Sequence, residues 1–136
     1  AEKHLARARH LAERHADLRI LSEVAEAEAR LSFSRGDDLG ATEHARSALA
    51  AADAGGSYLA AVGAHRTLGR LAHRRRDRPE AEGEFEAAAS LLRQHRAKSQ
   101  LRDLLGEWAD LRSGWGDIQG ANSLYAEALG RGATPS

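Results

Sequence analysis

The stretch GDIQGANSLYAEA, residues 116–128, decides the fold, because its pattern occurs twice earlier in the chain, as RDRPEAEGEFEAA at 76–88 and GDDLGATEHARSA at 36–48. The copies are 40 residues apart, and all share an Asp, two alanines and a core-type residue between the alanines. One further step back falls on Ala1, Leu5 and Ala8, which predicts that residue 1 lies partway through a repeat. A fixed period in the range of about 20 to 50 residues is typical of a solenoid of stacked helix pairs or other small units.

Composition narrows the classes of function. The chain has 136 residues, which is one domain's worth of chain, and its formal net charge of zero argues against a general nucleic-acid binder. Cysteine is absent, which excludes disulfides, thiol catalysis and thiolate metal sites. The sequence has no apolar run of membrane-spanning length and no signal-peptide pattern. We therefore expect a soluble, cytoplasmic protein without a membrane partner.

Apolar residues recur at steps of three and four along most of the chain, which predicts helices throughout. Gly36 and Gly116 fit the left-handed position that ends a helix, and Asp37 and Asp117 fit the cap of the next one. Seven helices are predicted, over residues 1–15, 18–34, 38–53, 57–75, 79–96, 99–114 and 118–130.

The remaining turns are less regular. Asp17, Ser57 and Ser99 are candidate caps at the turns between repeats. Arg76 stands where Gly36 and Gly116 stand in the other copies. A left-handed arginine costs about 1–2 kcal/mol, so this turn is expected to be either strained or differently shaped.

The repeated residues resemble the tetratricopeptide repeat, whose motif places Leu-Gly on the first helix of a pair and Ala-x3-Phe and Ala on the second. The repeat at residues 57–97 matches best, and the repeat at 98–131 supplies Trp108-Ala109 with Tyr125. The repeat at 17–56 departs from the motif, because Glu28-Ala29 stands where Leu-Gly is expected. The period of 40 is longer than the usual length of about 34 residues, and the usual late proline is absent. In the repeat at 57–97, the residues that match the motif are Leu68, Gly69, Ala81, Phe85 and Ala88.

This resemblance implies an all-α fold, a right-handed superhelix of antiparallel helix pairs, built as a single domain over residues 1–136. Residues 1–16 would be the second helix of a truncated unit, followed by three repeats at 17–56, 57–97 and 98–131. Long repeats rich in Ala and Arg also resemble those of bacterial multidomain transcriptional regulators. The resemblance therefore implies a protein- or peptide-binding scaffold, the sensing part of a larger regulator, in which another module contacts DNA.

The sequence offers no catalytic constellation, so we expect neither an enzyme nor a cofactor. The histidines lack the His-x3-His spacing that puts two metal ligands on one helical face. The serines lack the glycine-flanked turn of a nucleophile, and a phosphate-binding loop is missing. Surface histidine is therefore favoured over a metal site for His4, His10, His15, His44, His65, His73 and His95.

In tetratricopeptide proteins the first helix of each pair lines a groove, and this implies a partner-binding surface. Arg66, Arg70 and Arg74 share one helical face. They either pair with acids on neighbouring helices or bind an acidic peptide or a terminal carboxylate. Phe33 is either an exposed anchor or packs beneath the Gly36 turn. The predicted groove residues are Glu26, Arg30, Phe33, Arg66, Arg70, His73, Arg74, Asp103 and Asp110.

A second hypothesis is a structural module that self-associates through its end helices. A solenoid unit does not bury its own apolar face, and terminal units normally carry polar caps. The first and last predicted helices lack such a cap and keep apolar residues. The candidate contact residues are Leu5, Leu11, Leu124 and Leu129.

Overall fold

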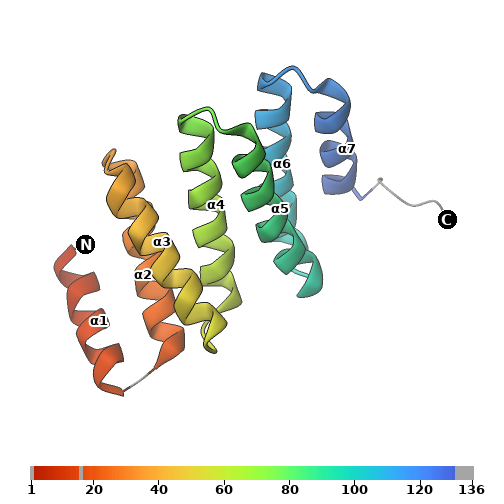
Figure 1. Ribbon diagram of the computed structural model, residues 1–136. Coiled ribbons are helices and arrows are strands. Elements are labelled where there is room, and N and C mark those ends of the chain that lie inside the picture. Colours follow the sequence, from red (N-terminus) through yellow and green to blue (C-terminus); the bar gives the residue numbers. More distant parts are fainter. Residues whose placement is uncertain (1, 16, 131–136) are drawn as a thin grey trace. The chain divides into compact units, whose positions relative to one another are not determined.

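The computed structural model describes residues 2–15 and 17–130, with side chains for 2–10 and 17–130. These residues form seven α-helices and no strand, which confirms the all-α prediction (Figure 1). The predicted bounds lie within two residues of the observed ones. The helices are α1 (Glu2–His15), α2 (Leu18–Ser34), α3 (Asp38–Asp53), α4 (Tyr58–Arg74), α5 (Arg78–Gln94), α6 (Lys98–Gly114) and α7 (Ile118–Ala128).

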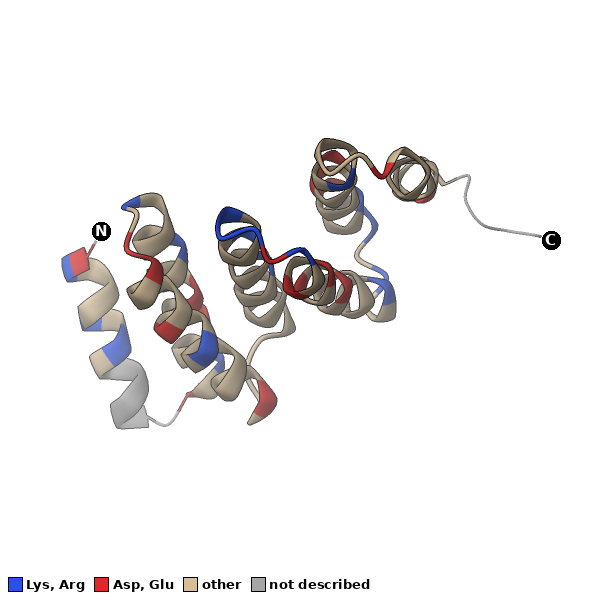
Figure 2. Cartoon of the chain, turned by 45° about the horizontal axis from the view of Figure 1, so that its top comes forward, with Lys and Arg blue, Asp and Glu red and all other residues tan. Residues whose placement is uncertain are grey.

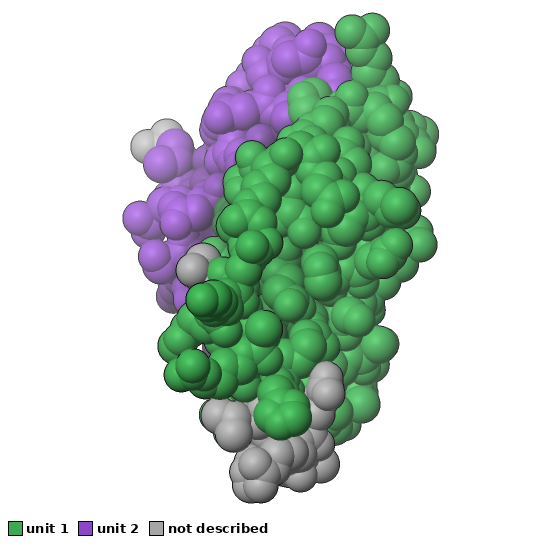
Figure 3. Space-filling model, turned by 90° about the vertical axis from the view of Figure 1, so that its left-hand side faces the viewer, with its two compact units in different colours: residues 1–88 green, residues 89–136 purple. Residues whose placement is uncertain are grey.

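The chain divides into two compact units, Ala1–Ala88 and Ala89–Ser136, which Figure 3 shows in green and purple. The boundary falls inside α5. Unit 1 contains α1 to α4 and most of α5. Unit 2 contains the end of α5 with α6 and α7. The division into an orphan helix and three repeats remains a prediction from the sequence.

Helix caps confirm most of the predicted starts. The side chain of Asp17 accepts hydrogen bonds from the backbone N–H groups of Arg19 and Ile20. Asp37 and Asp117 each accept from the N–H group three residues ahead, at 3.0 and 2.9 Å. These oxygens satisfy N–H groups that have no partner within the helix. Ser57 and Asp77 do the same for α4 and α5.

The predicted cap at Ser99 is wrong. Helix α6 begins at Lys98, so Ser99 lies within its first turn. The N-cap is Ala97, which has no side-chain acceptor. Ala97 lies 40 residues after Ser57, so it holds the true cap position of the repeat, and the replacement of Ser by Ala removes the cap bond.

The Arg76 turn has the shape of its glycine counterparts. Its φ is 62°, compared with 78° at Gly36 and 88° at Gly116. Asp77 N–H donates to Ala72 O at 2.8 Å, and the equivalent bonds after Gly36 and Gly116 both measure 2.9 Å. Of the two alternatives, the strained one is therefore observed. Arg96 also has a positive φ, 55°, which the sequence did not predict.

The core of unit 1 is built from small residues of α2 and α3 packed against larger ones of α4. Small side chains let helices approach closely, and two leucines of α4 fill the remaining space. Gly69 marks a similar approach to α5, because a Cβ atom there would lie 2.8 Å from the ring of Phe85. The core cluster comprises Ala25, Ala29, Ala41, Ala45, Ala48, Ala64, Leu68 and Leu71.

In unit 2, α6 packs against α7. Arg112 connects the two helices, since its guanidinium carbon lies 4.6 Å from the centre of the Trp108 ring and its Nη1 donates to Gly120 O at 3.2 Å. Residues buried on these two helices are Leu104, Leu105, Trp108, Ala109, Ala121 and Leu124. Within the described residues of either unit, no helix has the length and apolar character required to cross a membrane.

Candidate partner-binding surface

The predicted groove residues of unit 1 lie on α2 and α4, and these two helices contact each other. A Cβ atom on Gly63 would lie 2.5 Å from Glu26 Oε2, so the absence of a side chain lets Glu26 lie against α4. The same oxygen accepts a hydrogen bond of 2.7 Å from Arg30 Nε. The Arg30 side chain remains 61% exposed, whereas that of Glu26 is 13% exposed. Arg30 is thus held in place and still faces solvent.

Phe33 is not an exposed anchor. It is half-buried and packs against the core cluster of unit 1. The guanidinium carbon of Arg74 lies 4.1 Å from the ring centre, which is within the range of a cation–π contact. Arg74 also forms an ion pair with Asp38 at the start of α3. These contacts join α2, α3 and α4 at one end of the predicted groove.

The other predicted groove residues of α4 differ in exposure. Arg66 and Arg70 are half-buried and His73 is exposed, and all three interact with neighbouring groups. Figure 2 shows the turn between α4 and α5 coloured for its arginines. Two of these arginines form ion pairs, Arg74 with Asp38 and Arg75 with Glu80. Pairing with nearby acids therefore accounts for part of the basic stripe.

The predicted groove residues Asp103 and Asp110 lie on α6 in unit 2, and both are exposed. Asp110 accepts a hydrogen bond from the Tyr125 hydroxyl group. This hydrogen bond, together with desolvation and the negative charge of Asp110, raises the pKa of Tyr125 above its usual value. Asp103 and Asp110 are described only within their own unit, so the row that would join Arg30, Arg70 and Asp110 remains a prediction.

The residues proposed for self-association have different environments. Leu129 is 65% exposed and Leu5 is half-buried. Leu124 is 6% exposed, and this corrects its assignment to a contact face, because its side chain belongs to the buried side of α7. The side chain of Leu11 lies outside the described residues.

Charged contacts hold α1 against α2, and the sequence reasoning missed them. Arg9 donates to Glu28 Oε1 from Nε at 3.2 Å and from Nη2 at 2.5 Å. His44 Nδ1 of α3 approaches the same oxygen at 3.4 Å. Arg35 at the end of α2 pairs with Glu2 at the start of α1.

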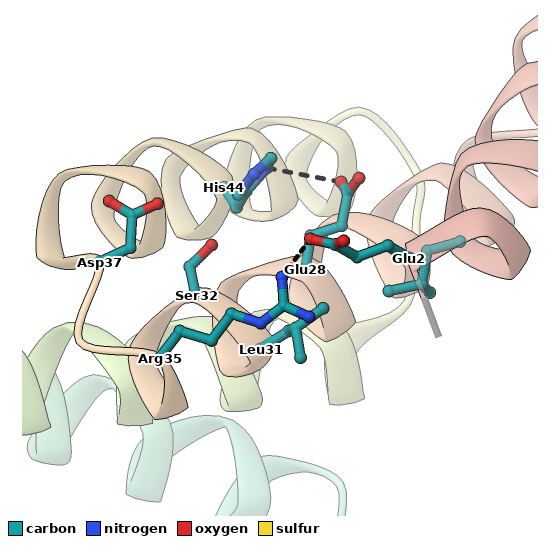
Figure 4. Close-up of a pocket in the computed structure, with 8 residues that line it drawn as sticks. Glu2, Glu28, Leu31, Ser32, Arg35, Asp37 and His44 are labelled. Carbon is teal, nitrogen blue, oxygen red and sulfur yellow. Dashed lines mark hydrogen bonds and ion pairs between the residues drawn. The ribbon is translucent and has the colours of Figure 1, made fainter.

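These contacts border a hollow of about 300 Å³, and Figure 4 shows Glu2 and Arg35 pointing toward each other across it. Leu5 and Leu31 line this hollow and also a second one between α1 and α2. The contact between α1 and α2 is therefore narrow in its apolar part and flanked by open space.

The repeat itself held the signal for this network. Forty residues after Glu28 stands Leu68, and forty after Arg9 stands Leu49. Leu68 belongs to the core cluster of unit 1 and Leu49 packs against it. An ion pair between α1 and α2 thus occupies the positions that are apolar between α3 and α4. A comparison of the repeats position by position shows this replacement of an apolar pair by a charged pair, which the pattern of a single helix does not.

Among the residues that the structure describes, no group of three or more His, Cys, Asp or Glu side chains is arranged to hold a metal ion. Comparison with known proteins found no matching family model, no matching curated protein and no matching solved structure.

Proposed function

We propose that this chain is a helical-repeat scaffold of the tetratricopeptide type that binds a protein or peptide partner along α2 and α4. The observation that carries the proposal is the exposed guanidinium group of Arg30, held by Glu26 beside α4. Arginine in a fixed orientation suits recognition of a carboxylate, because two parallel N–H groups match its two oxygens. An acidic peptide segment or a free C-terminal carboxylate is the ligand that fits.

From the same resemblance we propose a setting for this scaffold. The repeats would be the sensing part of a larger bacterial regulator, and partner binding would change the activity of the attached module. The sequence of the complete gene product tests this directly. A DNA-binding or nucleotide-binding module in the same polypeptide supports the proposal, and a gene product consisting of these repeats alone contradicts it.

Peptide selection tests the binding surface. A display library that includes acidic segments and free C-termini is screened against the full-length protein, and the selected peptides are measured by titration. Arg30→Glu and Arg70→Glu should each weaken binding about tenfold or more, since hydrogen bonds to charged groups contribute about 1.5–3 kcal/mol.

Arg46→Glu is the matched control, because it makes the same charge change at an exposed position of α3. It should leave the affinity within about twofold, as expected for a distant surface charge. Equal affinity of the selected peptides for wild type, Arg30→Glu and Arg70→Glu would contradict the proposed surface.

A second candidate function is self-association through α7. Leu129 is 65% exposed and Ile118 is 54% exposed, so this helix presents two large apolar side chains to solvent. Leu129→Glu should then shift the protein toward monomer in sedimentation velocity. Leu39→Glu is the control, because Leu39 is 72% exposed on α3. Equal sedimentation of the two variants and wild type would exclude α7 as the contact.

A further inference from the structure

The surface of α2 that contacts α1 contains Glu28, Leu31 and Arg35, and we call it the α1 seat. At one pair of repeat positions, its polarity differs from that of the contact between α3 and α4. On α3 and α4, Leu68 belongs to the core cluster of unit 1 and Leu49 packs against that cluster. At the same repeat positions, α1 and α2 carry Arg9 and Glu28. Their side chains are 30% and 19% exposed, so water reaches the ion pair. Water also has access to the hollows on either side of Leu5.

A polar, water-accessible contact has a low cost of separation. When α1 leaves its seat, Arg9 and Glu28 are rehydrated, so the seat loses little of the free energy that an apolar contact would lose. The apolar surface newly exposed belongs mainly to Leu5 and Leu31. The contact of α1 with α2 therefore opens more readily than the equivalent contact of α3 with α4.

We propose that this seat is an exchangeable docking site whose occupant is the α1 helix of a second copy of the protein. The complementarity is already present: the seat offers Glu28, Arg35 and Leu31, and α1 offers Arg9, Glu2 and Leu5 to match them. A second copy's α1 carries the same three groups. Reciprocal exchange therefore forms two seats with all of these contacts intact, which is the usual reason that swapping an element has a low energetic cost.

The resident helix competes with the incoming one through its own covalent connection, which acts as an effective concentration in the millimolar range. Exchange is thus concentration-dependent and gives wild-type pairing only at high protein concentration. Helix exchange involves α1 and its contact surface on α2, and it requires neither partner binding along α2 and α4 nor a contact through α7.

Charge reversal at the ion pair provides the test. In Arg9→Glu, the resident helix places an acid against Glu28, and in Glu28→Arg the surface of α2 places a cation against Arg9. Each variant alone disfavours its own seat in either arrangement. A mixture of the two allows both exchanged seats to pair opposite charges. The double variant R9E/E28R restores the pair within one molecule and serves as the control.

Native mass spectrometry and sedimentation velocity measure the outcome on the full-length protein. The mixture should give a 1:1 heterodimer at a concentration at least about tenfold below that at which either variant, the double variant or wild type pairs. Circular dichroism of each variant checks that α2 to α7 remain folded. Loss of the helical signal beyond that of α1 would mean that the ion pair supports the whole unit, which contradicts an exchangeable seat.

Three results would overturn the proposal. The first is a mixture of Arg9→Glu and Glu28→Arg that stays monomeric at concentrations at which the amides of α1 in the double variant are protected from hydrogen exchange. The second is a mixture of wild type with Arg9→Glu that pairs as well as the designed one, because the pairing would then not depend on charge complementarity. The third is loss of the heterodimer in a Leu129→Glu background, which would assign the contact to α7.

Discussion

The contacts of α1 with α2 and of α3 with α4 occupy equivalent positions of one repeat, yet one pair of positions is charged in the first contact and apolar in the second. Leu49 and Leu68 contribute to the core of unit 1, and the ion pair of Arg9 with Glu28 replaces them 40 residues earlier. A repeat scaffold therefore keeps its geometry while the strength of each interface changes. In this protein the difference separates a fixed body, α2 to α4, from a helix with a releasable contact.

The largest expected effect comes from matched leucine truncations. Leu71 is 2% exposed in the core cluster, and its equivalent in α2 is Leu31, which is half-buried beside α1. Leu71→Ala should lower the free energy of unfolding by about 2–5 kcal/mol. Leu31→Ala should lower it by about 1 kcal/mol, because its site is already partly open. Urea titration measures both, and equal losses would show that the α1 contact is as well packed as the α4 contact.

The turns after α2 and α4 extend the comparison to the backbone. Gly36 and Arg76 share a left-handed conformation, and only Arg76 carries the steric cost. Arg76→Gly should raise the free energy of unfolding by up to about 1–2 kcal/mol, reduced by the greater entropy of glycine in the unfolded state. Gly36→Arg should lower it by a similar amount. A thermal melt of each variant is sufficient, and an unchanged midpoint in both would mean that neither turn is strained.

A smaller effect should follow from making the first contact resemble the second. Replacing Arg9 and Glu28 together by Leu reproduces the pair found at Leu49 and Leu68. Substitution of a partly buried ion pair by apolar residues is often neutral or stabilising, and we expect a gain of about 1 kcal/mol here. The same double variant should slow helix exchange, because α1 must first leave an apolar contact before it can exchange. Destabilisation by the double substitution would contradict this account of the α1 seat.

Much of the fold was predictable because the repeat and the caps act locally. Asp17, Asp37 and Ser57 mark helix starts through bonds to N–H groups two or three residues away, and such signals are readable in one dimension. Ser99 was misassigned because the true cap position holds Ala97, whose side chain offers no signal. The left-handed backbone conformation of Arg96 was missed for the same reason, since an arginine in the sequence does not indicate a positive φ.

The candidate site was predictable only in part. Helical phase placed Glu26 and Arg30 on one face, and the structure joins them by a hydrogen bond. Phase alone did not show that Arg74 covers Phe33 and reaches Asp38, because those contacts depend on how far α4 lies from α2 and α3. Leu124 was assigned to an exposed face because an apolar stripe does not say which of its members is covered.

The most direct test of the difference between the two contacts is native-state hydrogen exchange of wild type at low and at high salt. Amides of α1 should exchange through a local opening that becomes more frequent as salt screens the Arg9–Glu28 and Glu2–Arg35 pairs. Amides of α4 should keep the protection of the unit's core at both salt concentrations. If α1 and α4 instead show the same protection and the same response to salt, the two contacts are equivalent in strength and α1 has no releasable seat.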